Sequence, residues 1–347
     1  MQLLKEKVMK RRRLTKVLFI LGGLILAFVT FSTPSGWALD QVSLRLDWIG
    51  YTPHHIAFWI AKEKGWFAQE GIDVTIGSGR GSVQTAQLLI SKKDPIGYMT
   101  GVELAQFVGK GAQLQMVAVY LPKALPSYRY LKKSGIRTPK DLEGRTVGLV
   151  TGGTQSSMWL PFAKAAGFDA SKVKVVQVDQ GSYNQLLLQG KIELSNGSVD
   201  GVSDILVERI EPIGQFALAD YLPVIGHGLA VHKDTKESKP DMIRRFIRAS
   251  SLGWRYLVTG GRKAAIEGGQ VAAKNVPGAP EVDVIAEGFE RLIPFMRSKN
   301  AEGRPLGWSS PKDWEAMLSF LQGLNMDEFK PIPKVEQVMT NALVPPE

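Results

Sequence analysis

The chain of 347 residues contains no cysteine. Disulfides, thiolate metal sites and cysteine nucleophiles are therefore excluded, and so is a lipid-modified N-terminal cysteine. Internal repeats and low-complexity segments are also lacking. Charged residues make up 22% of the chain and apolar residues 44%, values typical of an ordinary globular protein. The chain is long for one compact core and comfortable for two lobes.

The first part of the chain has a basic, then apolar, then small-residue order. Seven lysines and arginines stand against one acid, Glu6, in residues 1–16, and an apolar run follows at 17–31. This order is typical of a secretory signal peptide, and we expect cleavage after Ala38. A membrane anchor is the alternative, but it needs about 20 apolar residues, more than this run offers. The basic run Arg11–Arg13 leaves general secretion and the twin-arginine route both open.

The formal net charge of +10 is mostly a property of this leader. Without residues 1–38, which hold seven basic groups and one acid, the charge falls to +4. The remaining basic residues are scattered among acids, and no run of them is interleaved with aromatic residues. We therefore expect no nucleic-acid partner.

Strands and helices are predicted to alternate through the middle of the chain. Apolar residues alternate with polar ones at 42–46, Pro53 begins a helix, and Gly65 ends it. A second α/β series starts after Gly135 and includes a strand-like segment near residues 199–202. Strands that alternate with helices in this way imply mostly parallel sheets covered on both faces.

From Pro240 onward the pattern changes, because apolar residues recur at helical spacing. We therefore predict an α/β protein of two lobes, each an open, mostly parallel sheet flanked by helices, with a helical C-terminal tail on the first lobe. The expected division is a signal peptide at 1–38, a first lobe with its tail at 39–134 and 225–347, and a second lobe at 135–224.

Ligands of open α/β sheets bind beyond the carboxyl ends of the strands, which makes the following loops the candidate site. Trp48 follows the first strand directly and offers a flat apolar face for stacking, although a core position is the alternative. Tyr51 comes next in the same loop. Tyr98 and Thr100 end the third strand, where Thr100 either caps a helix or bonds a ligand.

His54 and His55 are neighbours at the start of the first helix. Neighbouring residues point about 100° apart on a helix, so we expect one to face the cleft and the other to face solvent. They are not expected to share a metal ion, and no other histidine lies at ligand spacing. We predict no metal and no cofactor. For His54, a ligand contact and a structural role are equal alternatives.

The loop Gly-Gly-Thr-Gln-Ser-Ser at residues 152–157 is the most informative one. It joins a strand to a helix N-terminus, where free N–H groups and the helix dipole favour an anion. Its candidate ligand-binding residues are Gly153, Thr154, Gln155 and Ser156. An ordinary helix cap is the alternative. The Gly-Lys-Ser/Thr element of a nucleotide phosphate loop is missing.

Four further candidates follow the later strands: Ser182, Tyr183, Asp200 and Asp204. The two carboxylates would meet a ligand amine or, equally, end a strand and cap a helix. Several aromatic residues near strand ends favour a small planar ligand, and the helix start at the glycine-rich loop favours an acidic group on it. We expect binding without catalysis, because no acid–base cluster and no Gly-x-Ser-x-Gly elbow is present.

Four segments resemble the solute-binding proteins of ABC importers for nitrate, sulfonates, taurine and thiamine-precursor pyrimidines. The first is Leu-Asp-Trp at 46–48 with His54 downstream, followed by 61–67 and 70–74. The others are 109–111 before 117–119, then 136–148, and finally 199–201. The resemblance implies a two-lobed periplasmic binding protein of type II, whose cleft closes by hinge motion. The ligand-facing loops at 50–53 and 94–97 depart from the family pattern, so no single member's ligand carries over.

The resemblance implies a monomeric periplasmic receptor that hands a small molecule to an ABC permease and its ATPase in the inner membrane. A sulfonate, an aromatic acid and a pyrimidine-like compound are the candidate ligands. Input to a sensor system is the alternative, and neighbouring genes would separate the two. The family's eukaryotic relatives include a pyrimidine synthase that uses a histidine and a cysteine-rich loop, so the lack of cysteine argues against that activity.

Overall fold

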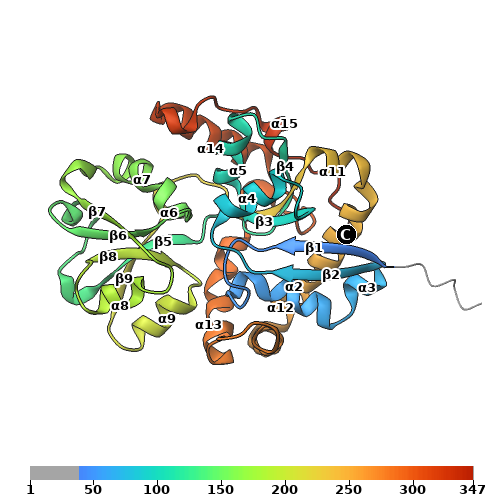
Figure 1. Ribbon diagram of the computed structural model, residues 1–347, viewed down its shortest axis with the longest axis horizontal. Coiled ribbons are helices and arrows are strands. Elements are labelled where there is room, and N and C mark those ends of the chain that lie inside the picture. Colours follow the sequence, from blue (N-terminus) through green and yellow to red (C-terminus); the bar gives the residue numbers. More distant parts are fainter. Residues whose placement is uncertain (1–38, 347) are drawn as a thin grey trace, which may run out of the picture. The chain divides into compact units, whose positions relative to one another are not determined.

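The computed structural model describes residues 39–346 (Figure 1). The predicted signal peptide, residues 1–38, lies outside the described residues, so the signal and its cleavage stay predictions. The remainder forms one compact unit. Within the described range we find no helix with the length and apolar character needed to cross a membrane.

Two five-stranded sheets organise the chain. The strands of the first sheet are β1 (Asp40–Arg45), β2 (Ile72–Gly77), β3 (Ile96–Thr100), β4 (Leu114–Val119) and β10 (His227–His232). The strands of the second sheet are β5 (Pro126–Leu131), β6 (Thr146–Val150), β7 (Lys174–Val178), β8 (Leu194–Ser198) and β9 (Ile213–Ala217). The strand orders are β2-β1-β3-β10-β4 and β7-β6-β8-β5-β9. We call each sheet with the helices packed on it the first and the second lobe.

Helices connect and cover the strands. Those between the strands are α2 (Ile56–Glu63), α3 (Trp66–Gln69), α4 (Ser82–Ile90), α5 (Gly101–Gly109), α6 (Thr154–Ser157), α7 (Trp159–Ala166), α8 (Tyr183–Leu188), α9 (Val202–Glu208) and α10 (Leu218–Tyr221). Those after the last strand are α11 (Lys233–Ser238), α12 (Pro240–Asn275), α13 (Val282–Leu292), α14 (Pro311–Leu324) and α15 (Val335–Val338). The short 3-10 turns include η1 (Pro53–His55) and η3 (Pro139–Leu142).

The two-lobed α/β fold is confirmed, but each sheet is mixed rather than mostly parallel. β10 runs antiparallel to β3 and β4, and β5 runs antiparallel to β8 and β9. The other pairs are parallel. β5 is the first strand after the chain leaves the first sheet, and β10 is the first after it returns. Each crossing strand therefore enters the middle of its new sheet against the direction of its neighbours.

The lobe border expected at residues 134 and 135 falls after β5, although β5 pairs within the second sheet. We therefore propose that the first crossing lies between β4 and β5. The strand expected near residues 199–202 is also misplaced, because the strand is β8 and Val202 already begins α9. β8 is buried but carries serine and asparagine, whose side chains are hydrogen-bonded within the sheet.

The helical tail packs on the first lobe, as predicted. α12 lies along α2 so closely that a Cβ on Gly253 would stand 2.1 Å from the carbonyl oxygen of Ala57. α12 breaks at Gly261, whose φ of 56° and ψ of −146° only glycine adopts readily. Buried aromatic side chains such as Phe246 and Trp254 fill the core beside this helix contact.

The second lobe has a strongly packed face and a weakly packed one. An aromatic core covers one face of its sheet and includes Tyr128, Trp159, Phe162, Phe168 and Phe216. The other face holds only a small apolar cluster of Leu131, Leu187, Ile192, Val207 and Ile213. The edge strand β7 is largely accessible to solvent. The second lobe therefore has less apolar support than the first.

Candidate functional site

A cavity of about 300 Å³ is lined by residues of both lobes. The first lobe contributes the segment after β1, the η1 turn, the start of α4 and the first residue of β10. The second lobe contributes the first residue of β5, the loops after β6 and β7, the end of β8 and the starts of α6, α8 and α9. These are mostly loops that follow strands, which is where open α/β sheets bind ligands.

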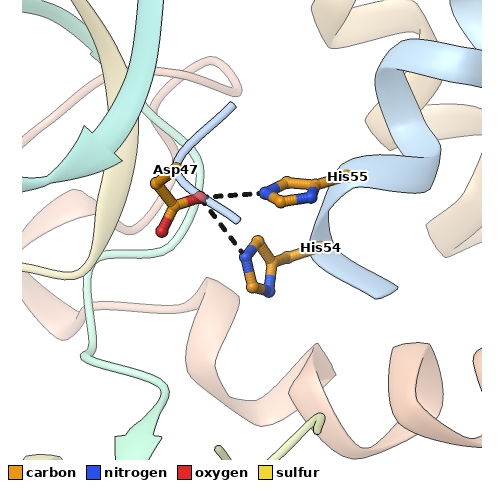
Figure 2. Close-up of side chains that lie close together, drawn as sticks. All are labelled: Asp47, His54 and His55. Atoms are coloured by element: carbon orange, nitrogen blue, oxygen red, sulfur yellow. Dashed lines mark hydrogen bonds and ion pairs between the residues drawn. The ribbon is translucent and has the colours of Figure 1, made fainter. Parts of the chain in front are cut away.

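The wall formed by the first lobe is built around Asp47. Its Oδ1 atom lies 2.9 Å from His55 Nε2 and 3.7 Å from His54 Nε2. Dashed lines in Figure 2 mark both contacts. Its Oδ2 atom lies 3.0 Å from Nε2 of His227, the first residue of β10. His54 Nδ1 lies 2.6 Å from Oδ2 of Asp200 in the second lobe, so this contact joins the two lobes.

The charges of this cluster depend on one another. Burial would lower the pKa of His54, but the carboxylates of Asp200 and Asp47 outweigh it and raise that pKa to about 10. Burial and the positive charge of His54 lower the pKa of His55 to about 4. Burial would raise the pKa of Asp47, but His227 and its two other histidine neighbours hold that pKa well below its usual range. At pH 7 an ionised Asp47 therefore faces a protonated His54.

The wall formed by the second lobe carries amides and hydroxyls. Asn196 donates its side-chain N–H to Oε1 of Gln155 at 3.0 Å, and the hydroxyls of Tyr183 and Ser203 lie 3.0 Å apart. Asp204 accepts a hydrogen bond from the Gln215 side chain at 2.7 Å. This wall is therefore held in place by contacts among its own side chains.

Asp204 stands in front of a buried arginine. Arg129 of β5 is fully buried, and its Nη1 lies 3.4 Å from Oδ2 of Asp204. Its guanidinium also lies over the ring of Tyr183, 4.9 Å from the centroid. Burial raises the pKa of Asp204, and the charge of Arg129 only partly offsets that rise. The arginine thus supports the wall from behind without lining the cavity.

Eight of the predicted site residues line the cavity. They are Trp48, Tyr51, His54, Gly153, Thr154, Gln155, Tyr183 and Asp204. Five do not: Tyr98, Thr100, Ser156, Ser182 and Asp200. The first group comes from segments that directly follow β1 and β6, from η1 and from the starts of α8 and α9.

The residues that do not line the cavity have partners elsewhere in the protein. Tyr98 lies in β3, a strand between β1 and β10 that is buried throughout, and its ring stacks on His227. Asp200 is fully buried behind His54. The Thr100 hydroxyl bonds the side chains of Glu103 and Ser82 instead of capping its helix. These groups support the wall from behind.

Two serines predicted to contact a ligand satisfy local backbone groups instead. Ser156 Oγ donates to the carbonyl oxygen of Val150 at 2.7 Å, and Ser182 Oγ donates to that of Asp179 at 3.2 Å. The helix expected to begin at the glycine-rich loop is split at Met158 into α6 and α7. Because α6 has only four residues, the anion preference expected of its N-terminus loses its physical basis.

One of the two neighbouring histidines, His54, lines the cavity as expected, but the solvent-facing position expected of the other was wrong. His55 does not face solvent but is fully buried, and both rings reach the same oxygen of Asp47. Their ring centroids are 4.3 Å apart because the 3-10 turn η1 places both side chains toward β1. His227, far along the chain, joins them through the crossing strand, so a third histidine does lie within reach of the same carboxylate.

Several cavity-lining residues escaped prediction: Asp47, Gln180, Asn184, Asn196, Ser203 and His227. Asp47 carried a usable signal, since it directly follows β1 and satisfies the strand-end rule. Asn196 lies within β8, and the polar residues of this strand do not give the apolar pattern by which a strand is predicted. His227 had no local signal, because its role depends on the antiparallel insertion of β10 beside β3.

The comparisons with known proteins agree on one family. The family model described as "NMT1/THI5 like" matches residues 52–264. The "Putative thiamine biosynthesis protein" of Haemophilus influenzae is 26% identical over 53% of this chain, and the match spans 59% of that relative's length. The "Formylaminopyrimidine-binding protein" of Halalkalibacterium halodurans is 26% identical over 82% of this chain and 85% of the relative.

The chain is also similar to part of an enzyme and, in fold, to a binding protein of known structure. The "4-amino-5-hydroxymethyl-2-methylpyrimidine phosphate synthase" of Uromyces fabae is 28% identical over 32% of this chain and 33% of the enzyme. Among solved structures, the alkanesulfonate-binding protein SsuA of Xanthomonas axonopodis pv. citri has a TM-score of 0.66. It is 14% identical and the match covers 89% of this chain and 99% of that one, a likeness of fold alone.

Proposed function

The chain belongs to the NMT1/THI5-like family, and from this premise we propose that it is the extracytoplasmic substrate-binding component of an ABC importer. The protein would capture a small organic molecule in the cavity between its lobes and close on it by hinge motion. It would then present the cargo to a permease and its ATPase in the inner membrane. The cavity lined by both lobes is the observation that carries this proposal.

The chemistry of the cavity favours a neutral or weakly basic nitrogen heterocycle, such as an aminopyrimidine, over a sulfonate or nitrate. Among residues 39–346, those that line the cavity include no lysine or arginine, while Asp47 and Asp204 supply carboxylates. The half-buried rings of Trp48 and Tyr51 offer faces for stacking a planar ring. Amide and hydroxyl groups of the second lobe can pair with ring nitrogens and exocyclic amines.

A binding role is preferred over the synthase activity of the fungal relative. That relative shares only a third of its length with this chain. The chain contains no cysteine, whereas the resemblance implies a cysteine-rich loop for such synthases. The relative named for formylaminopyrimidine binding matches over most of both chains. Its longer match supports a receptor.

A ligand screen by thermal shift and calorimetry tests the proposal. The panel contains aminopyrimidines, an alkanesulfonate, taurine, an aromatic carboxylate and nitrate, each added to ligand-free protein. A ligand at a hundred times its Kd adds about 2.7 kcal/mol of stability, which is readily seen as a raised Tm. We expect an aminopyrimidine to give the largest shift. An anion that binds best would contradict the ligand class, and no shift with any compound would contradict the receptor role.

Trp48→Ala tests the stacking wall directly. We expect it to weaken binding of the planar ligand roughly tenfold or more, since a buried aromatic contact contributes about 0.5–1.5 kcal/mol beyond its buried area. The matched control is Trp308→Ala, another half-buried tryptophan that does not line the cavity. Equal affinity in both variants would remove Trp48 from the site.

A further inference from the structure

Three of the chain's four histidines converge on one carboxylate. His54, His55 and His227 all direct Nε2 at Asp47, and all four side chains are buried. Asp47, His54 and His227 also line the cavity, so the cluster is reachable from it. Figure 2 shows the rings of His54 and His55 turned toward the same carboxylate oxygen.

The outer nitrogens of two of these rings are held in the way that metal-binding histidines usually are. His54 Nδ1 lies 2.6 Å from the carboxylate of Asp200, and His55 Nδ1 lies 3.0 Å from the carbonyl oxygen of Ile49. A metal-ligating histidine almost always donates its other N–H to a carboxylate or a backbone carbonyl, which orients the ring. Both Nε2 atoms thus point inward, with the ring orientation held by contacts at Nδ1.

The hydrogen-bond partners of the cluster leave a place for a cation at its centre. A neutral imidazole carries one N–H, yet His55 has an acceptor against each nitrogen, Ile49 O at 3.0 Å and Asp47 Oδ1 at 2.9 Å. When Nδ1 donates outward, the lone pair of Nε2 faces a carboxylate oxygen. The Nε2 atom of His54 is buried and has no hydrogen-bond partner among the described residues. A proton or a metal ion between these atoms would satisfy both.

We propose that Asp47, His54 and His55 bind a divalent transition-metal ion of the Zn²⁺ type, with His227 orienting the carboxylate through its second oxygen. The three ligand atoms lie within 4.8 Å of one another. Ligand atoms on a tetrahedral Zn²⁺ are about 3.4 Å apart, as follows from bond lengths of about 2.1 Å. The distances from Asp47 Oδ1, 2.9 Å and 3.7 Å, fall on either side of that value.

The donor set also selects the class of ion. Imidazole nitrogens suit Zn²⁺, Cu²⁺ or Ni²⁺, whereas Mg²⁺ and Ca²⁺ prefer oxygen donors. Three protein ligands leave one position of a tetrahedral ion open, and Asp47 and His54 both border the cavity. A cavity-bound nitrogen heterocycle or a water molecule would occupy that position.

Zinc titration of protein without a polyhistidine tag tests the site. The protein is stripped with EDTA, and Zn²⁺ binding is measured by calorimetry, with no organic ligand present. The result is therefore independent of the proposed transport role. We expect one Zn²⁺ per chain, and at least tenfold weaker binding in His54→Gln and in His55→Gln. The matched control is His232→Gln, which changes the fourth histidine outside the cavity and should leave zinc affinity unchanged.

A second variant keeps the test decisive if either glutamine variant fails to fold, as judged by circular dichroism. Asp200→Asn retains all three proposed ligands and removes only the outer carboxylate of His54. Loss of such a partner lowers metal affinity about 10–100-fold. No zinc binding by the wild-type protein would overturn the site and leave a proton at the centre of the cluster. Zinc binding that is unchanged in the folded variants would also overturn it.

Discussion

In the first lobe, β10 enters the middle of the sheet antiparallel to β3 and β4, and in the second lobe β5 does the same between β8 and β9. The cavity walls differ in chemistry despite this shared topology. The first lobe supplies a carboxylate surrounded by histidines, and the second supplies amides, hydroxyls and one carboxylate backed by Arg129. The same architecture therefore presents two chemically distinct walls to one cavity.

The lobes also differ in their support. In the first lobe, α12 packs against α2 in backbone contact at Gly253, and β3 and β4 are buried throughout. In the second lobe, one sheet face has only a small apolar cluster and β7 is largely exposed. The buried ion pair of Arg129 and Asp204 lies in this less supported lobe. Burying this ion pair costs desolvation free energy, and removing one partner leaves the other charge buried and unpaired. We therefore expect changes of polar groups to lower the stability of the second lobe more than that of the first.

Arg129→Met should have the largest effect. It leaves the buried Asp204 without its cation, and breaking a buried pair costs about 3–5 kcal/mol of unfolding free energy. The matched change in the first lobe is Arg45→Met, whose arginine is partly exposed and pairs with Asp94. We expect that change to cost about 1 kcal/mol or less. Urea unfolding of both variants measures the difference, and equal costs would refute the proposed asymmetry.

Gly253→Ala and Gly148→Ala compare the packing of the two lobes. A Cβ at Gly253 meets a backbone carbonyl oxygen at 2.1 Å, whereas one at Gly148 in β6 meets the terminal methyl of Ile192 at 2.6 Å. Backbone cannot move aside as a methyl group can. We expect a loss of about 1–3 kcal/mol at Gly253 and less than about 1 kcal/mol at Gly148. Thermal unfolding measures both losses of stability, and a larger loss at Gly148 than at Gly253 would contradict the expectation.

Asp204→Asn should weaken binding of a basic heterocycle by about tenfold, equal to about 1.4 kcal/mol. Asp204 is the one charged group that the second lobe contributes to the lining among residues 39–346. An exposed carboxylate of the same lobe, Asp220, provides the control Asp220→Asn. Calorimetry on folded protein measures both. Unchanged affinity for a protonated ligand would show that the charge of the first wall suffices.

Arg209→Met should have the smallest effect. Arg209, at the end of α9, lies 3.4 Å from Asp283 and 3.3 Å from Glu287 of α13, and all three side chains are substantially exposed. Exposed ion pairs contribute up to about 1 kcal/mol, so ligand affinity should change by about fivefold at most. The difference in ligand affinity between the variant and the wild-type protein should vanish near 1 M salt, where the Debye length is about 3 Å. Titrations at low and high salt check this, and a persistent effect would indicate a role beyond charge.

Much of the fold could be predicted from local patterns. The alternation at β1, the proline that begins η1 and the glycine that follows α2 are signals within a few residues of the elements they mark. The crossing strands gave no such signal. β5 begins with proline and contains the buried Arg129, and β10 begins and ends with histidine, so neither shows a simple apolar alternation. Arg129 and His227 are paired by partners that lie far away along the chain.

The part of the site that follows strand ends could be predicted, because the strand-end rule needs only the local sequence. It selected Trp48, Tyr51, His54 and the loop at 153–155, all of which line the cavity. It could not tell Tyr98 in a central strand from a residue at the cleft, because that depends on β10 lying beside β3. Nor could it distinguish a helix start that presents its N–H groups from a one-turn helix such as α6.

Residue order alone was enough to establish the α/β class, the helical tail and several of the loops that line the cavity, because hydrophobic periodicity, caps and turns act over a few residues. The union of His54, His55 and His227 around Asp47 was decided only by tertiary structure. Those side chains come from separate elements, and β10 reaches the first sheet only after the chain has built the second. Burial then sets their charges, since the pKa of each group depends on neighbours that no local pattern identifies.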